Sequence, residues 1–140
     1  MNNLNITERH NQNVTVLDLA GNIRMGEDTI KLRTALRILV KEGERNILLN
    51  LADISQIDSS GLGEMVSGYV SVRKSGGELK LLHLTDRVRE IMIITKLVTI
   101  FESYENEAEA INSFQITSEN IETTESAFVT AKLDKALISL

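Results

Sequence analysis

Apolar and polar positions repeat with two different periods along the chain, and the change of period marks the expected elements. Two short runs with strand-like alternation, 4–8 and 14–20, flank a stretch of turn-forming residues and predict an N-terminal hairpin whose second strand ends at Gly21. From Asp28, a candidate N-cap, apolar residues recur at the spacing of an amphipathic helix that ends near Gly43. These helical positions are Leu32, Ala35, Leu36, Leu39 and Val40.

The middle of the chain alternates between strand and helix patterns. The run 46–51 is short and nearly all apolar, which is typical of a strand buried on both faces. A second helix should begin just after Asp58-Ser59-Ser60-Gly61 and end at the glycine pair 76–77, because glycine supplies a left-handed helix stop. A strand at 78–84 follows. One face of this helix carries Leu62, Met65, Val66 and Tyr69.

Two further helices and a last strand complete the pattern. Thr85 is the candidate N-cap of a third helix, 98–101 is a short apolar strand, and Asn106 caps a fourth helix that ends near Phe114. The expected order is ββαβαβαβα. Because strands that alternate with helices need crossover connections, we expect a single α/β domain over residues 1–114, with a mainly parallel mixed sheet and an N-terminal hairpin.

The C-terminal residues 115–140 differ in character from this domain. Residues 115–126 are rich in Thr, Ser, Glu and Asn, which predicts a flexible acidic linker. After them the sequence allows two interpretations, a short amphipathic helix or a disordered tail. The apolar residues concerned are Val129, Leu133, Ala136, Leu137 and Leu140.

Composition excludes several classes of protein. The longest apolar run, 91–94, is far below the ~18 residues of a membrane span, and the N-terminus lacks the pattern of an export signal, so we expect a cytoplasmic protein. There is no cysteine, and His10 and His83 are the only histidines. These residues are too few for the usual zinc sites, and we expect neither a metal nor another cofactor.

The formal net charge of −5 is unevenly distributed along the chain. Residues 1–96 carry 13 Lys and Arg against 12 Asp and Glu, whereas residues 97–140 carry 2 against 8. Binding of nucleic acid needs concentrated basic residues and usually some aromatic faces, but aromatic residues make up only 4% of this chain. We therefore expect no nucleic-acid partner.

The sequence Asp58-Ser59-Ser60-Gly61-Leu62-Gly63 lies where a buried strand hands over to a helix. Unpaired N–H groups and the helix dipole favour an anion at such a helix start, which suits a serine that is phosphorylated. From spacing alone, simple capping by the small polar residues is the stronger interpretation. A phosphate-binding P-loop would need a lysine where Glu64 stands, and a serine-hydrolase elbow would need a glycine where Ile57 stands.

Two segments carry a resemblance to a known family. The sequence NILLNLADISQIDSSGLG, residues 46–63, followed by GGELKL at 76–81, is similar to the bacterial anti-sigma-factor antagonists that consist of a STAS domain. The resemblance covers the order and spacing of elements from residue 4 to residue 114. It implies a regulatory binding protein, not an enzyme.

What the resemblance implies is a partner switch controlled by phosphorylation. In this family the unphosphorylated antagonist binds an anti-sigma factor, which is also an ATP-dependent serine kinase, and so releases a sigma factor; a phosphatase reverses the modification. Ser59 would then be the phosphoacceptor, with Asp58 and Ser60 shaping the loop. Gly61 and Gly63 would allow a partner's backbone to approach, and Leu62 and Met65 would offer it an apolar contact.

One position departs from the family pattern. Many members have an acidic residue where Arg24 stands in this sequence, three positions after Gly21. Arg24 would pair with phosphate on Ser59, meet a partner surface of different charge, or simply be solvated. The alternative function within the same fold is a STAS accessory subunit that holds a transport or signalling partner constitutively, and an independent serine hydrolase is a third, weaker candidate because the sequence supplies no base.

Overall fold

The structure is a computed structural model that describes residues 3–120. The described chain has the order of elements ββαβαβαβα, with one additional short 3₁₀ helix before the last strand. The bounds are β1 (Asn5–Asn11), β2 (Val14–Ile23), α1 (Glu27–Lys41), β3 (Asn46–Ile57), α2 (Ser59–Lys74), β4 (Glu78–Leu82), α3 (Asp86–Ile94), η1 (Leu97–Thr99), β5 (Ser103–Tyr104) and α4 (Glu107–Asn120).

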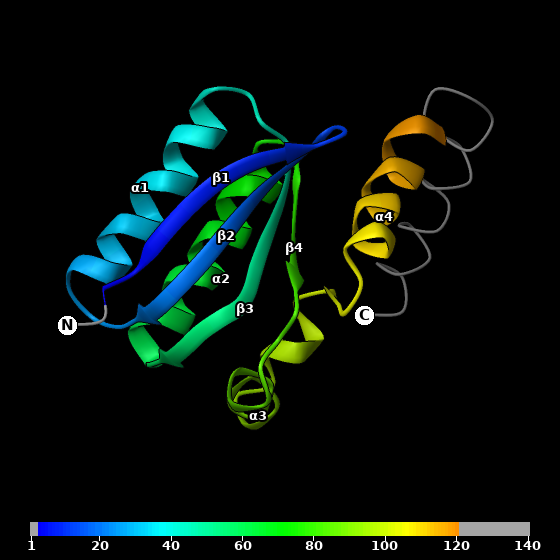
Figure 1. The fold of residues 1–140 in the computed structure, drawn as a ribbon. Coiled ribbons are helices and arrows are strands. Elements are labelled where there is room, and N and C mark those ends of the chain that lie inside the picture. Colours follow the sequence, from blue (N-terminus) through cyan, green and yellow to red (C-terminus); the bar gives the residue numbers. More distant parts are fainter. Residues whose placement is uncertain (1–2, 121–140) are drawn as a thin grey trace, which may run out of the picture.

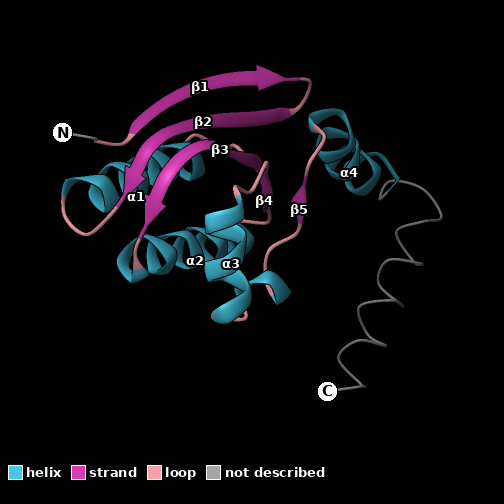
Figure 2. Cartoon of the chain, turned by 60° about the horizontal axis from the view of Figure 1, so that its bottom comes forward, coloured by secondary structure: helices cyan, strands magenta, loops and turns pink. Residues whose placement is uncertain are grey.

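The five strands form one mixed sheet in the order β1-β2-β3-β4-β5. Figure 1 shows β1 to β4 in that order, and Figure 2 also shows β5 beside β4. The β1–β2 hairpin is antiparallel, and the other three pairs are parallel. The predicted fold class is therefore confirmed. Because β2 and β3 run in parallel with Ile23 opposite Ile57, both strands deliver their C-terminal ends to the same edge of the sheet.

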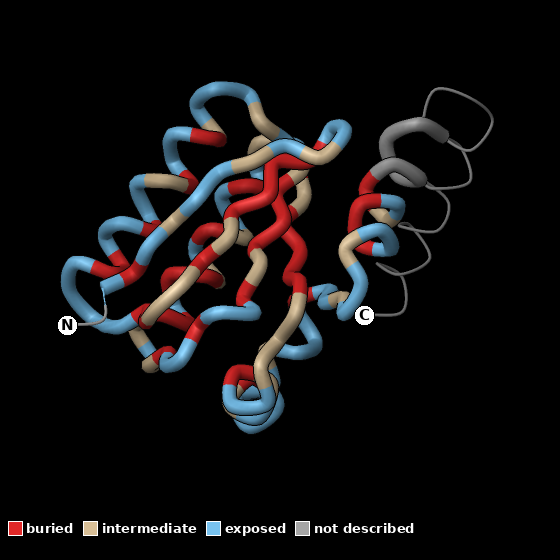
Figure 3. The backbone as a smooth tube through the Cα atoms, in the orientation of Figure 1, coloured by how far each residue is buried: buried red, intermediate tan, exposed pale blue. Residues whose placement is uncertain are grey.

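Helices cover both faces of the sheet, which explains the apolar runs in its central strands. On β2, Leu17 packs into the large core beneath α1, α2 and α3, whereas its neighbour Val16 packs into a smaller core against α4. On β3, Leu49 and Leu48 divide between the two cores in the same way. Figure 3 shows the resulting band of buried residues along the middle of the sheet.

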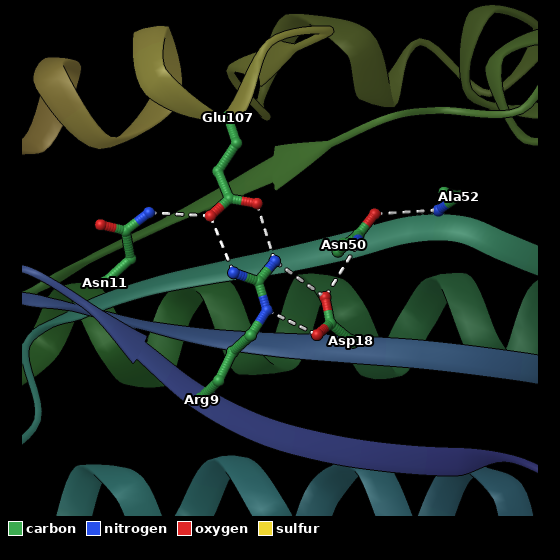
Figure 4. A network of polar contacts seen from close by, with 6 residues as sticks. All are labelled: Arg9, Asn11, Asp18, Asn50, Ala52 and Glu107. Atoms are coloured by element: carbon green, nitrogen blue, oxygen red, sulfur yellow. Dashed lines mark hydrogen bonds and ion pairs between the residues drawn. The ribbon is translucent and has the colours of Figure 1, made fainter.

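A network of polar side chains fixes α4 to the sheet (Figure 4). The guanidinium of Arg9 donates to Asp18 at 2.6 Å and to Glu107, the first residue of α4, at 2.7 Å. Asn11 also donates to Glu107 at 2.8 Å, and Asn50 donates to Asp18 at 2.8 Å. The hydrogen bonds from Arg9 lower the pKa of Glu107 to about 2.

The last strand differs from the prediction. The apolar run 98–101 was expected to be a strand, but the chain forms η1 there and the strand β5 follows later. Val98 and Ile100 are 40% and 39% exposed, so only Phe101 reaches the core, where its ring meets Tyr69 edge to face at 5.3 Å. One inward apolar residue suits a turn of 3₁₀ helix, because a strand would have to bury two alternate positions.

Several element ends also differ from the prediction. Gly21 lies inside β2 with φ of 106° at a register shift, and a Cβ there would collide with the carbonyl oxygen of Asn3. Asp28 is not the N-cap of α1, which is Gly26. Instead its carboxylate accepts hydrogen bonds from the backbone N–H groups of Leu4 (3.1 Å) and Arg24 (3.2 Å).

Two segments run longer than expected. The strand β3 continues past the predicted end at Leu51 to Ile57, and α4 continues past Phe114 to Asn120, where a linker was predicted. The remainder of that linker and the candidate C-terminal helix around Val129 and Leu133 lie outside the described residues.

Candidate functional site

The candidate site is the tight connection between β3 and α2. The strand ends at Ile57 and the helix begins at Ser59, so Asp58 alone joins them. Its backbone N–H donates to the carbonyl of Ile23, the last residue of β2, at 3.3 Å. The loop that leads from β2 to α1 therefore lies directly beside the start of α2.

Asp58 holds the two sides of this site together. One carboxylate oxygen accepts the Gly61 N–H at 2.9 Å and caps α2, while the other accepts the Met25 N–H of the neighbouring loop at 3.0 Å. These bonds, the one from Met25 foremost, hold the pKa of Asp58 below its usual range, and the charge of Arg24 acts in the same direction. The capping interpretation of Asp58 is thus confirmed, and the residue has a second task that its sequence position does not reveal.

The two serines differ in accessibility. Ser59, the first residue of α2, is exposed, and its hydroxyl makes no hydrogen bond with residues 3–114. Ser60 is half-buried. No acidic side chain lies in the first turn of α2, so only the Asp58 cap balances the positive end of the helix dipole there. An incoming phosphate donor can therefore reach Ser59 more freely than Ser60.

The next residues of the motif face inward, which corrects part of the prediction. Leu62 is 5% exposed and Met65 is fully buried, both in the large core, so neither presents an apolar surface to a partner. A Cβ on Gly61 would collide with the carbonyl oxygen of Ile23 and with the Ile57 side chain. Gly61 thus allows close packing within this chain, and the expected approach of a partner's backbone does not apply to it.

The outward face of the site consists of other residues. Gly63 is exposed, with open space where a Cβ would lie, and Arg24 is exposed on the adjoining loop. Met25 is 77% exposed beside them, the most exposed of the large apolar residues between positions 3 and 114. Sequence patterns did not single out Met25, because one apolar residue between polar loop residues has no periodic neighbours.

Comparison with known proteins agrees with this geometry. A family model described as the STAS domain matches residues 5–110. An anti-sigma-B factor antagonist of Bacillus subtilis is 34% identical over 100 residues, which span 71% of this chain and 90% of the relative. This chain belongs to the STAS-domain anti-sigma-factor antagonists.

Solved structures of similar proteins share the fold of this STAS domain. An anti-sigma factor antagonist from Mycobacterium paratuberculosis has a TM-score of 0.69 at 18% identity, with 80% of this chain and 94% of that chain covered. The Bacillus protein SpoIIAA in its phosphorylated form has a TM-score of 0.61 at 20% identity, with 78% and 98% covered.

His10 of this STAS domain lies away from the serine loop. It contacts Glu8 and Thr15 near the hairpin end of β2, whereas the loop adjoins the other end of that strand. Among residues 3–114 no group of metal-binding side chains comes together, and no helix in the described part of the chain is long and apolar enough to cross a membrane.

Proposed function

We propose that this protein is an anti-sigma-factor antagonist whose binding to its partner is switched by phosphorylation of Ser59. The observation that carries the proposal is the contrast at the start of α2, where Ser59 is exposed and unbonded while the residues around it are fixed by Asp58 and packed into the core. Such a loop presents one reactive hydroxyl on a rigid frame.

The fold can accept the added charge. A phosphate brings about −1.5 to −2 charges at neutral pH. The N-terminal end of the α2 dipole attracts this charge, and Arg24 supplies a cation on the adjoining loop. Repulsion from the carboxylate of Asp58 opposes these two effects, so we expect little net change in stability.

The same charge is costly across an interface. A partner shaped for the neutral hydroxyl of Ser59 must either bury the phosphate without a counter-charge or withdraw, and each ~1.4 kcal/mol lost weakens binding tenfold. In the proposed complex Arg24, Met25 and Gly63 meet the partner around Ser59, and Ser60 completes the loop. Leu62 and Met65 support this surface from inside.

The partner in this proposal is an anti-sigma factor that is also an ATP-dependent serine kinase, and a phosphatase restores the free hydroxyl. The protein itself acts in the cytoplasm as a regulatory binding protein, without catalysis. The alternative role, a STAS subunit that holds its partner constitutively, predicts that phosphate on Ser59 leaves binding unchanged. The relatives' designation as anti-sigma factor antagonists favours the switch.

The experiment measures binding of the full chain to its cognate anti-sigma factor by calorimetry. Ser59→Ala should bind constitutively in the presence of ATP, because it cannot be phosphorylated. Ser59→Asp should bind at least tenfold more weakly while unfolding within a few degrees of the wild type. Ser60→Ala is the matched control and should still lose binding on incubation with ATP.

Peptide mapping of the phosphorylated protein identifies the modified serine directly. Phosphate on Ser60 alone, or Ser59→Asp binding as tightly as the wild type, would remove Ser59 from the proposed role.

A further inference from the structure

A groove separates α1 and α2, which lie side by side on one face of the sheet (Figures 1 and 2). Its volume is about 250 Å³. On α2 three small residues, Ser67, Gly68 and Ser71, line the groove beside Glu64. On α1 the apolar lining consists of the half-buried Val40 and the buried Leu36. A Cβ on Gly68 would collide with the Leu36 side chain, so the helices approach each other closely at that point and leave the groove beside it.

Basic residues line the α1 side of this groove. Arg33, Arg37 and Lys41 follow one another at intervals of four residues and so form a single stripe along the helix. Glu64 is the only carboxylate among the lining residues, and it is already held by Arg33 through two hydrogen bonds of 2.9 Å. The groove therefore keeps two positive charges that no lining acid balances.

Those two charges belong to Arg37 and Lys41. Both side chains are exposed, and neither makes a hydrogen bond or an ion pair within the described part of the chain. Free cations beside an apolar surface are complementary to a molecule that carries an anionic group on an apolar body.

We propose that the groove between α1 and α2 is a binding site for a small organic anion, whose carboxylate or phosphate pairs with Arg37 and Lys41 and whose apolar body lies against Leu36 and Val40. The volume lies just below the ~300–1,000 Å³ of sites for larger ligands, which favours a short apolar chain over an extended cofactor. This site is separate from the Ser59 loop and does not depend on the switch.

Calorimetric titration of the full chain with octanoate, octyl phosphate, butanoate and the uncharged octanol tests the proposal. We expect octanoate to bind roughly tenfold or more tightly than butanoate, because burial of each additional methylene is favourable. The double variant Arg37→Gln/Lys41→Gln should bind octanoate and octyl phosphate at least tenfold more weakly. Comparison of octanoate with octyl phosphate shows whether a carboxylate or a phosphate is preferred, and either preference supports the site.

A matched control carries the same change in net charge outside the groove. Lys74→Gln/Arg87→Gln replaces two exposed cations that do not line it and should bind octanoate like the wild type. Ser71→Leu fills the groove without any change of charge and should also abolish binding. The proposal fails if octanol binds as tightly as octanoate, if the Arg37→Gln/Lys41→Gln variant keeps its affinity, or if no probe binds.

Discussion

Replacement of Asp58 by alanine should loosen the Ser59 loop at both of its anchors. The variant loses the cap on the Gly61 N–H and the bond to the Met25 N–H. Loss of an N-cap costs about 0.5–2 kcal/mol, and loss of a second hydrogen bond costs about 0.5–1.5 kcal/mol. Because Met25 is exposed and water can replace its lost acceptor, we expect a total near the lower half of the sum, about 2 kcal/mol.

Urea unfolding followed by circular dichroism measures this loss, which corresponds to roughly 5–10 °C in the melting temperature of a domain of this size. Asp58→Asn keeps an oxygen for the Gly61 N–H but cannot accept from both donors, so its loss should be about half as large. Asp53→Ala removes the same charge from an exposed position of β3 and should change stability by no more than about 0.5 kcal/mol.

The acid dependence gives an independent check on the Asp58 anchors. The folded-state pKa of Asp58 is lowered, so its contribution is present above the ordinary carboxyl pKa and is lost as the pH falls through the folded value. The difference in unfolding free energy between the wild type and Asp58→Asn should therefore shrink in acid. Equal stability of the wild type and Asp58→Ala at neutral pH, together with unchanged binding of the anti-sigma factor, would refute the anchoring role.

Three further predictions test other parts of the fold. Glu107→Gln should lower stability at neutral pH by about 1–2 kcal/mol, less than the Glu107 pKa of about 2 implies, because the Arg9 pair is partly solvated. The difference from the wild type should shrink as the pH falls below 5 and disappear only below about 2, and a constant difference would contradict the prediction. Gly61→Ala should cost about 1–3 kcal/mol through overpacking against Ile23, whereas Gly63→Ala, which has open space, should be neutral or slightly stabilising in thermal unfolding. Truncation after Asn120 should leave a cooperatively unfolding domain, and loss of the cooperative transition would place the C-terminal residues in the core.

Long periodic patterns predicted their elements well, since helix and strand periods are local properties of the sequence. The 3.6-residue repeat of α1 is such a pattern. The caps Asp58 and Thr85 were also predictable, because a cap bonds to its own helix. The short run 98–101 was ambiguous because an apolar run of this length fits a strand and a helical turn equally well. The predicted cap Asp28 was wrong for a different reason. Its carboxylate accepts a hydrogen bond from the N–H of Leu4, whose position beside α1 results from the tertiary fold and not from the local sequence.

The roles of Leu62 and Met65 were predictable from their own periodicity. Both lie on the apolar face that predicted α2, and such a face is buried against the sheet. The resemblance to a binding protein assigned them to the partner instead, which the burial of their side chains contradicts. The close approach of Gly61 to Ile23 was not predictable, because nothing local indicates which strand end lies beside the loop.

The alternation of inward and outward residues at the start of α2 explains how one modification can change binding without changing the fold. Ser59 and Gly63 are four positions apart and lie on the same outer side of the helix, whereas Gly61 and Leu62 between them face the core. Charge added to Ser59 therefore meets solvent or a partner, and it does not meet the packed interior. A phosphate on Ser60, which is half-buried, would disturb the domain itself, and so in the proposed switch the choice of Ser59 over Ser60 decides whether the partner or the fold responds.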